Sequence, residues 1–299
     1  MSPAEQRAQL WTIIATILVS TSFPIGAAIT HGLDSVVLTL LRFVLAAIMF
    51  APIVIWKFGL PMPTIKDLGR YSVLSALMVG YFWAMFEALR YTSPLNTATI
   101  FTLTPAIGAA VAAVVLRERL KNRSFIALAL GLVGAVWVIY RGNLDSFLAL
   151  SFNKGDAIFF AGTVCIGVYG PLIKFFHRGE PMARMSFWVM ATGSVWLLLI
   201  ALPRFDGVVW SDVPVNVYWG IAYLALFTTL ITFFIFQWSA TVIGPTKVLS
   251  YTYVQPALVL VIGLILGDSP PPVMTYPGLI IVFSAMVVLQ LAAPKPVKA

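Results

Sequence analysis

The stretch YTSPLNTATIFTLTPAIGAAV, residues 91–111, decides the fold of this chain, because its outline returns in IGPTKVLSYTYVQPALVLVI, residues 243–262. Each stretch carries two prolines eleven residues apart, and the second of them is Pro105 in one stretch and Pro256 in the other. Most of the surrounding positions are apolar, as is typical of a segment that lies in hydrocarbon. The same pattern at an offset of 151 residues indicates an internal repeat.

A second pair of prolines supports this repeat. Pro24 and Pro171 each stand seven residues before a basic residue or histidine that glycine follows, at an offset of 147 residues. Changes in loop length absorb the difference between the two offsets. We therefore predict that residues 1–143 and 150–299 are two copies of one unit. The apolar run 10–29 then has a counterpart inside the chain, which favours a true first helix over a cleaved signal peptide.

The composition makes the lipid bilayer the expected solvent of the chain. Of its 299 residues 60% are hydrophobic and only 10% are charged, and the mean hydropathy is +0.95. Soluble domains carry about 25% charged residues. About twenty residues of helix cross a hydrocarbon core. Ten segments meet this requirement: 10–29, 36–56, 68–90, 95–116, 124–140, 155–176, 185–202, 217–240, 247–266 and 277–293. We predict an all-α membrane protein of ten transmembrane helices.

Five spans in each unit place the second copy upside down relative to the first, so the repeats are inverted. The basic residues test this inversion, because lysine and arginine gather on the cytoplasmic side. With the N-terminus inside, fourteen of the nineteen basic residues fall in cytoplasmic stretches, and only Arg141, Lys154 and Arg204 fall in outer loops. This bias predicts a bacterial inner-membrane protein with both termini in the cytoplasm.

Other functional classes find little support in the sequence. The net charge of +8 is distributed as a topology signal rather than as a nucleic-acid-binding surface. The single cysteine, Cys165, excludes a cysteine-cluster metal site, and no His-Glu-x-x-His motif or phosphate-binding loop is present. We predict no metal and no cofactor. An intramembrane enzyme is the alternative from another class.

Inverted repeats are typical of secondary transporters, which bind substrate near the midplane where helices are interrupted. Proline removes a backbone donor and frees a carbonyl group, so Pro24, Pro105, Pro171 and Pro256 are predicted functional kinks rather than merely tolerated ones. Polar and aromatic residues at similar depth are the predicted substrate-binding lining: Ser20, Thr21, Phe23, Tyr81, Trp83, Thr104, Tyr169, Thr232, Tyr251 and Gln255. The alternative is that the hydroxyls bond to their own helices and the rings fill the bundle.

Two opposite charges lie within predicted spans. Arg42 lies about 10 Å and Glu87 about 6 Å from the outer helix ends, at 1.5 Å per residue. Charges at depth are costly unless they are partnered. The sequence leaves two interpretations open. Either Arg42 and Glu87 form a structural ion pair, or Arg42 anchors a substrate carboxylate while Glu87 binds a proton or an amine.

The segments from Glu87 to Asn96, Thr104-Pro105 and Arg117 to Leu120, with Leu41-Arg42-Phe43, resemble the EamA-like repeat of the drug/metabolite transporter superfamily. The resemblance to the superfamily covers nearly the whole chain. Within the superfamily, the chain also resembles bacterial aromatic amino acid exporters, but this second resemblance is weaker. It implies ten helices, cytoplasmic termini and metabolite export. The second copy departs from the pattern at Gly267-Asp268, where glutamate is usual and three prolines follow.

We therefore expect a transporter that exports small amphiphilic metabolites, foremost amino acids including aromatic ones, by alternating access at a midplane cavity. A carrier of nucleotide sugars or phosphorylated metabolites is the alternative within transporters. The expected partners are a small-molecule substrate and the lipid bilayer, with no nucleic acid. Small residues at four-residue spacing (Ala127, Gly131, Ala135) are explained by internal packing as well as by dimerisation, and we favour packing and a monomer.

Overall fold

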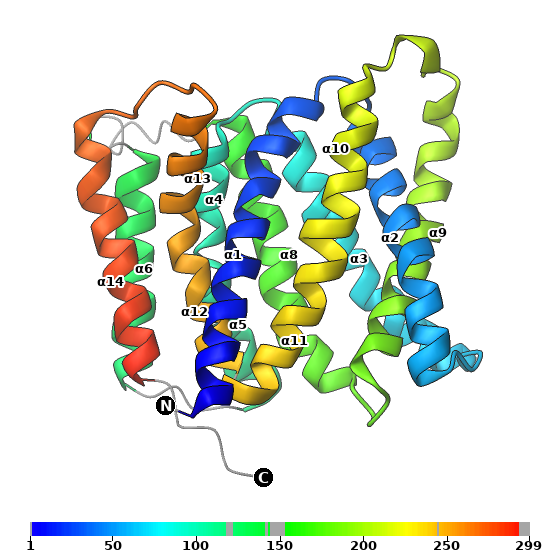
Figure 1. Cartoon of the computed structure of the whole chain (residues 1–299), viewed down its shortest axis with the longest axis horizontal. Coiled ribbons are helices and arrows are strands. Elements are labelled where there is room, and N and C mark those ends of the chain that lie inside the picture. The colour runs from blue at the N-terminus through cyan, green and yellow to red at the C-terminus, as the bar shows by residue number, and fades with distance from the viewer. Residues whose placement is uncertain (1, 118–121, 141–142, 144–152, 244, 293–299) are drawn as a thin grey trace.

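The computed structural model describes residues 2–117, 122–140, 143, 153–243 and 245–292, and every regular element within these ranges is helical (Figure 1). The helices are α1 (Pro3–Ile29), α2 (Ser35–Phe58), α3 (Ile65–Ala88), α4 (Pro94–Phe101), α5 (Thr104–Val115), α6 (Asn122–Ile139), α8 (Lys154–Phe176), α9 (Met182–Phe205), α10 (Val215–Ala225), α11 (Thr232–Ile243), α12 (Pro245–Ser250), α13 (Gln255–Ile265) and α14 (Tyr276–Ala292). Short helical turns η1 (Trp210–Asp212), η2 (Leu226–Ile231), η3 (Tyr251–Val254) and η4 (Val273–Thr275) join or extend them.

These elements make ten crossings, because α4 and α5, α10 to α11, and α12 to α13 each form one span. Within the described residues nine spans are long and apolar enough to cross a membrane, and α6 supplies the tenth with its apolar segment Ser124–Ile139. Corresponding helices of the two halves run in opposite directions, as α1 and α8 do in Figure 1. The predicted all-helical fold of two inverted five-helix repeats is confirmed.

Polar caps carry several helices beyond their apolar runs. Capping boxes open three of them, formed by Ser2 with Glu5, Thr64 with Asp67, and Asn153 with Asp156. A capping box satisfies backbone N–H groups that the first turn leaves free. For this reason α1 begins at Pro3, seven residues before the apolar segment that predicted it.

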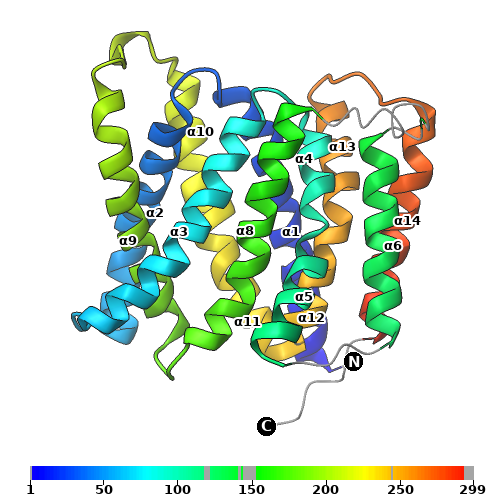
Figure 2. The ribbon, with the colours of Figure 1, turned by 180° about the vertical axis from the view of Figure 1, so that it is seen from behind.

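The two repeats interleave rather than pack as separate bodies. Each of the helix pairs α6–α14, α3–α8, α2–α9 and α1–α11 joins one helix of each repeat, and α6 with α14 and α2 with α9 form the two ends of the bundle (Figure 2). Close approach requires small residues at these contacts. A Cβ atom on Gly162 of α8 would lie 2.6 Å from the Cβ of Ala84 on α3.

The small residues of α6 pack inside the chain. A Cβ atom on Gly131 would lie 2.5 Å from the ring of Tyr253, and Ala127 belongs to the same buried cluster as Tyr253 and Val282. This is the internal packing that we favoured for them. The oligomeric state stays a prediction.

Three spans depart from a continuous α-helix. The α4–α5 span is divided at Thr102 and Leu103, so that Pro105 is the second residue of the half-helix α5. The α12–α13 span is divided by the 3₁₀ turn η3, and Pro256 is the second residue of α13. The third departure is η2, a π-helical turn between α10 and α11. By contrast, α1 and α8 run without interruption through Pro24 and Pro171.

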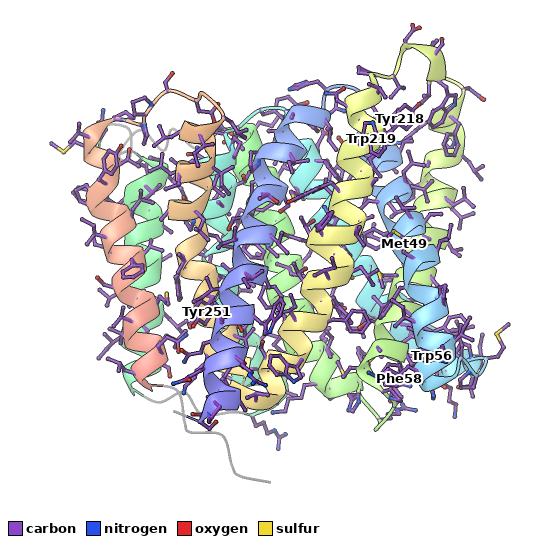
Figure 3. All side chains as sticks on the ribbon, in the orientation of Figure 1. Met49, Trp56, Phe58, Tyr218, Trp219 and Tyr251 are labelled. Carbon is purple, nitrogen blue, oxygen red and sulfur yellow. The ribbon has the colours of Figure 1, made fainter. Side chains whose placement is uncertain are left out.

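Aromatic side chains mark the two faces of the bundle at which the helices begin and end. Trp219, 73% exposed, lies near the face opposite the termini, and Trp56, 89% exposed, lies near the face where α1 begins and α14 ends (Figure 3). Tryptophan is enriched at both membrane interfaces. The two residues therefore bracket the hydrocarbon zone, and the face with the termini is called the terminal face below.

We predict that the terminal face is cytoplasmic, because the connections at this face carry most of the basic residues. In a Cys165→Ser background, cysteines placed at Asn143 and Asp206 should react with a membrane-impermeant thiol reagent added to whole cells. Cysteines placed at Asn122 and Arg178 should react only after the membrane is permeabilised. The reverse labelling pattern would contradict this orientation.

Candidate functional site

Arg42 is a charged side chain enclosed within the bundle. It lies in the eighth position of α2, about 10 Å from the helix end, and is only 2% exposed. Its Nη2 donates hydrogen bonds to Thr228 Oγ1 and Thr229 Oγ1, both at 3.0 Å, and its Nε donates to Thr229 Oγ1 at 3.2 Å. Its Nη1 is buried and has no hydrogen-bond partner in the described structure.

The π-helical turn η2 explains why two consecutive threonines face one guanidinium group. Thr228 Oγ1 and Thr229 Oγ1 both donate to the carbonyl oxygen of Leu224, each at 2.9 Å. A hydroxyl group has one proton and two lone pairs, so both oxygens are left as acceptors toward Arg42. Single π-helical turns occur frequently at functional sites.

The neighbours of the Arg42 guanidinium are uncharged. Its central carbon lies 4.2 Å from the centroid of the Phe82 ring, a cation–π contact. Tyr81 is close enough to interact with it electrostatically. Among the residues that the structure describes, no carboxylate forms an ion pair with Arg42. The site therefore holds a buried positive charge that only neutral groups solvate.

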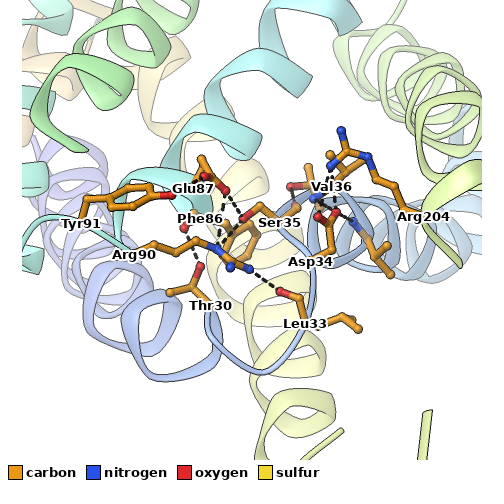
Figure 4. A network of polar contacts seen from close by, with 12 residues as sticks. Thr30, Leu33, Asp34, Ser35, Val36, Phe86, Glu87, Arg90, Tyr91 and Arg204 are labelled. Carbon is orange, nitrogen blue, oxygen red and sulfur yellow. Dashed lines mark hydrogen bonds and ion pairs between the residues drawn. The ribbon is translucent and has the colours of Figure 1, made fainter. Parts of the chain in front are cut away.

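The structural ion pair between Arg42 and Glu87 is a wrong prediction. Glu87 Oε2 lies 3.5 Å from Arg90 Nε, one turn further along the chain, and it accepts a hydrogen bond from Ser35 Oγ at 2.8 Å. Arg90 also donates to the carbonyl oxygen of Leu33 at 2.7 Å (Figure 4). Arg42 lies seven residues inside α2, whereas Glu87 is the penultimate residue of α3 and lies at the level of Ser35, the first residue of α2, so the two charges are at different depths.

A layer of aromatic rings lies at the depth of Arg42 and comes from four other spans. The rings of Phe23 and Phe101 are 6.1 Å apart, those of Phe23 and Phe159 are also 6.1 Å apart, and those of Tyr81 and Phe101 are 5.5 Å apart. All four rings are at most 9% exposed. Together with α3, which carries Tyr81, they join α1, α4 and α8 and close the bundle toward the face opposite the termini.

Several residues of the predicted lining bond to their own helices. Ser20 Oγ donates to Thr16 O at 2.8 Å, and Thr232 Oγ1 donates to Thr229 O at 3.5 Å. Thr21 donates to Leu18 O and also lies 3.0 Å from the Tyr223 hydroxyl. These contacts are the self-satisfied arrangement that the sequence left open as an alternative.

Thr104 and Gln255 behave differently, although both were predicted to line the site. Each is the first residue of a half-helix, α5 or α13, and each immediately precedes one of the repeated prolines. Thr104 Oγ1 and Gln255 Oε1 are buried and lack a hydrogen-bond partner among the described residues. At about 15 Å from the helix ends, they are unsatisfied polar atoms at the midplane.

The remaining predicted residues lie apart from Arg42. Tyr169 packs beside the buried cluster of Tyr71 and Met185, and Tyr251 lies in the half of the bundle nearer the terminal face (Figure 3). Trp83 is 37% exposed and lines a surface cavity of about 710 Å³ between α3 and α9. The structure therefore brings together Phe23 and Tyr81 but not Trp83.

Two neighbours of the site, Thr228 and Thr229, lie in the same span as Thr232 and belong with it to the polar residues expected at this depth, whereas Phe82 was not predicted. The signal for the first two is the doublet of threonines in an otherwise apolar span, opposite a lone deep arginine. Phe82 carries no signal of its own in a chain with 21 phenylalanines.

Polar contacts also close the terminal face. Arg70 Nη1 lies 3.1 Å from Glu180 Oε1 and joins α3 to the α8–α9 connection, while Arg184 donates to the carbonyl oxygen of Phe58. Partial burial raises the pKa of Glu180, but hydrogen bonds from backbone N–H groups and the charge of Arg70 outweigh burial and hold the pKa below its ordinary value. Both contacts join a residue of the first repeat to a residue of the second at the terminal face.

Comparisons with known proteins give this geometry a context. Residues 6–140 and 153–291 each match the model of the EamA-like transporter family. An uncharacterized transporter of Bacillus subtilis, YyaM, is 29% identical over 229 residues, which cover 76% of this chain and 75% of the relative. A Streptantibioticus cattleyicolor protein named "Probable terminal-alkyne amino-acid exporter" is 22% identical over 285 residues, 93% of this chain and 92% of the relative. A solved crystal structure with 18% identity has a TM-score of 0.70 and covers 96% of this chain and 98% of that chain, so the fold is shared.

The corrected pairing makes a prediction about stability. Because Arg42 and Glu87 are not in contact, the effects of Arg42→Met and Glu87→Gln on the free energy of unfolding should add to within about 0.5 kcal/mol. The effects of Glu87→Gln and Arg90→Met on the free energy of unfolding should deviate from additivity, because Glu87 and Arg90 form an ion pair. Denaturant unfolding of the purified variants in detergent measures both cycles, and a coupling above about 1 kcal/mol between Arg42 and Glu87 would contradict their separation in the structure.

Proposed function

The chain belongs to the EamA-like transporter family, and from this premise we propose that it is a secondary transporter that exports amino acids, with Arg42 as the anchor for the substrate carboxylate. The observation that carries the proposal is Nη1 of Arg42, a buried donor without a partner in the described structure, on a charge without a counter-ion there.

A carboxylate group fits this donor. The guanidinium fork already uses Nε and Nη2 on two threonine hydroxyls, so a carboxylate oxygen at Nη1 would complete its hydrogen bonds and neutralise its charge. An uncompensated buried charge costs several kcal/mol. The substrate would therefore supply the counter-ion that the described chain lacks.

The surrounding aromatic rings favour an apolar or aromatic side chain on the substrate. Phe23, Tyr81 and Phe101 belong to one buried cluster in which Tyr81 lies near Arg42, and an apolar side chain buried against them would gain about 1.5–3 kcal/mol. An apolar wall discriminates weakly between side chains that differ by a methylene. We expect several amino acids to be carried.

The two repeats supply the alternating access that this function needs. We propose that helices of residues 1–143 shift against the helices of residues 150–299 that they contact, so that the aromatic layer opens toward one face and the Arg70–Glu180 contact opens toward the other. With the basic terminal face in the cytoplasm of a bacterium, substrate would enter from the terminal face and leave at the opposite one.

Relatives support the amino acid class over the alternatives. One relative is named a terminal-alkyne amino-acid exporter, at 22% identity. A sugar phosphate or nucleotide sugar carries at least two negative charges and calls for more than one cation, whereas Arg42 is the one fully buried cation among the described residues. Among the described residues no group of three or more His, Cys, Asp or Glu side chains could hold a metal ion for an intramembrane enzyme.

Flux measurements test the anchor. In liposomes loaded with labelled phenylalanine, Arg42→Gln should lower efflux by roughly tenfold to a hundredfold, because a hydrogen bond to a charged group contributes about 1.5–3 kcal/mol. Arg42→Lys, which keeps the charge but loses the fork, should fall between Arg42→Gln and the wild type. Arg204→Gln is the matched control, since Arg204 is an exposed arginine on α9. Equal efflux from folded wild type and folded Arg42→Gln would contradict the role of Arg42 as the anchor for the substrate carboxylate.

The structure separates two aromatic residues that the sequence grouped together. Tyr81→Ala removes one ring from the aromatic wall and enlarges the space beside Arg42. This change should shift the preference among phenylalanine, leucine and tryptophan. Trp83→Ala alters a surface cavity and should leave the order of preference unchanged. Competition between labelled and unlabelled amino acids in the same liposomes measures the order, and a shift in Trp83→Ala alone would contradict this placement.

A further inference from the structure

A second cavity lies at the face opposite the termini, away from Arg42. It has a volume of about 440 Å³ and lies between the ends of α4, α6 and α13, under the segment 268–275. Apolar residues such as Val138, Val259 and Leu260 form much of its wall. Among the described residues that line it, Asp268 is the one charged group.

The C-terminus of α13 fixes the position of Asp268. The helix ends in a Schellman motif, in which Gly267 adopts a φ of 96° and the N–H of Asp268 donates to Gly263 O at 2.8 Å. The motif folds the carboxylate back over the last turn of the helix. A Cβ atom on Gly263 would lie 2.6 Å from Asp268 Oδ2, so the carboxylate occupies the space that this glycine leaves.

Asp268 is exposed at this face, but the helix end beside it is an unfavourable neighbour for a carboxylate. The C-terminal end of a helix carries a partial negative charge and favours cations. In the first repeat Arg117, with a positive φ of 53°, corresponds to Gly267, and Glu118 follows it as Asp268 follows Gly267, but there the sequence flanks the carboxylate with Arg117, Arg119 and Lys121. The second repeat has no basic residue between Lys247 and Lys295. No cationic side chain pairs with Asp268 among the residues that the structure describes.

Two further observations describe what the cavity could hold. Thr275 lines the cavity, and its hydroxyl oxygen is buried without a hydrogen-bond partner in the described structure. Ser93, at the cap of α4, adds another hydroxyl group. A single carboxylate falls short of the six to eight oxygen ligands that Ca²⁺ takes. The chemistry suits an ammonium group beside an apolar body.

We propose that this cavity binds the ammonium group of a small organic amine, with Asp268 as the counter-ion. Resting on the proposed function, the natural occupant is the exported amino acid at its release step. The ammonium group then forms an ion pair with Asp268 beside the C-terminal end of α13. The carboxylate group accepts hydrogen bonds from Thr275 and Ser93, and the substrate side chain packs against the apolar wall of the cavity.

Two truncated analogues separate this site from Arg42. Phenethylamine has the ammonium group of phenylalanine without the carboxylate, and 3-phenylpropionate has the carboxylate without the ammonium group. Binding of each is measured by titration calorimetry on the full-length protein in lipid nanodiscs. Asp268→Asn should weaken phenethylamine binding about tenfold or more, as expected for the loss of a charge-assisted hydrogen bond.

The control variants isolate the cause. Gly263→Ala should also weaken phenethylamine binding, because the added Cβ displaces the carboxylate without removing it. Thr275→Val should weaken phenylalanine binding more than phenethylamine binding, since only the amino acid has a carboxylate for the hydroxyl. Asp206→Asn removes the same charge from the same face outside the cavity and should have no effect.

The two analogues test the amine site and the Arg42 anchor independently of one another. Unchanged phenethylamine affinity in Asp268→Asn, or no phenethylamine binding by the wild type, would overturn the amine site. Loss of 3-phenylpropionate binding in Arg42→Gln but not in Asp268→Asn supports two separate sites. Retention of 3-phenylpropionate binding in Arg42→Gln counts against the carboxylate anchor of the proposed function, while a tenfold loss of phenethylamine affinity in Asp268→Asn upholds the amine site.

Discussion

Hydrocarbon offers no hydrogen-bond partner, so every polar group inside the membrane must find its partner within the protein. This constraint accounts for the ten helical crossings and for the capping boxes at helix ends that reach water. It also explains why Ser20 and Thr232 bond to carbonyl groups of their own helices. The α4–α5 and α12–α13 spans break only within the bundle, where neighbouring helices shield the backbone groups that the breaks release.

Arg42 is the place where the constraint is met only in part. Three of its hydrogen bonds go to neutral hydroxyl groups and its charge rests on the face of Phe82, yet Nη1 has no partner in the described structure. A buried cation without a counter-ion is costly, and in our proposal a substrate carboxylate relieves that cost only while it is bound. The same deficit makes the arginine a poor structural element and a good binding group. The Glu87–Arg90 pair, near the helix ends, is complete by comparison.

The two repeats have the same arrangement of helices, but they differ in some of the polar and charged residues at matching positions. Thr104 and Gln255 occupy matching positions before matching prolines, and both carry unsatisfied buried oxygens. Arg42, by contrast, meets a π-helical turn that belongs to the second repeat alone among the described spans. At the ends of the matched spans, Arg117 stands where the second copy has Gly267 followed by Asp268. Glu118 follows Arg117 as Asp268 follows Gly267, so both copies have a carboxylate there in sequence, but only the first copy flanks it with basic residues.

The sequence by itself determined the ten spans, the inverted repeat and the interruption of two spans near Pro105 and Pro256, because hydropathy, span number and the missing proline donor act locally along the chain. It also determined the depth of Arg42, since depth follows from the rise of 1.5 Å per residue. Only the tertiary structure decided which groups meet Arg42. The direction in which a side chain leaves its helix depends on how neighbouring helices pack, and a π-helical turn shifts that direction for every residue after it. For this reason Glu87 turned to Arg90, Trp83 turned to a surface cavity, and two threonines of the second repeat came to hold the arginine of the first.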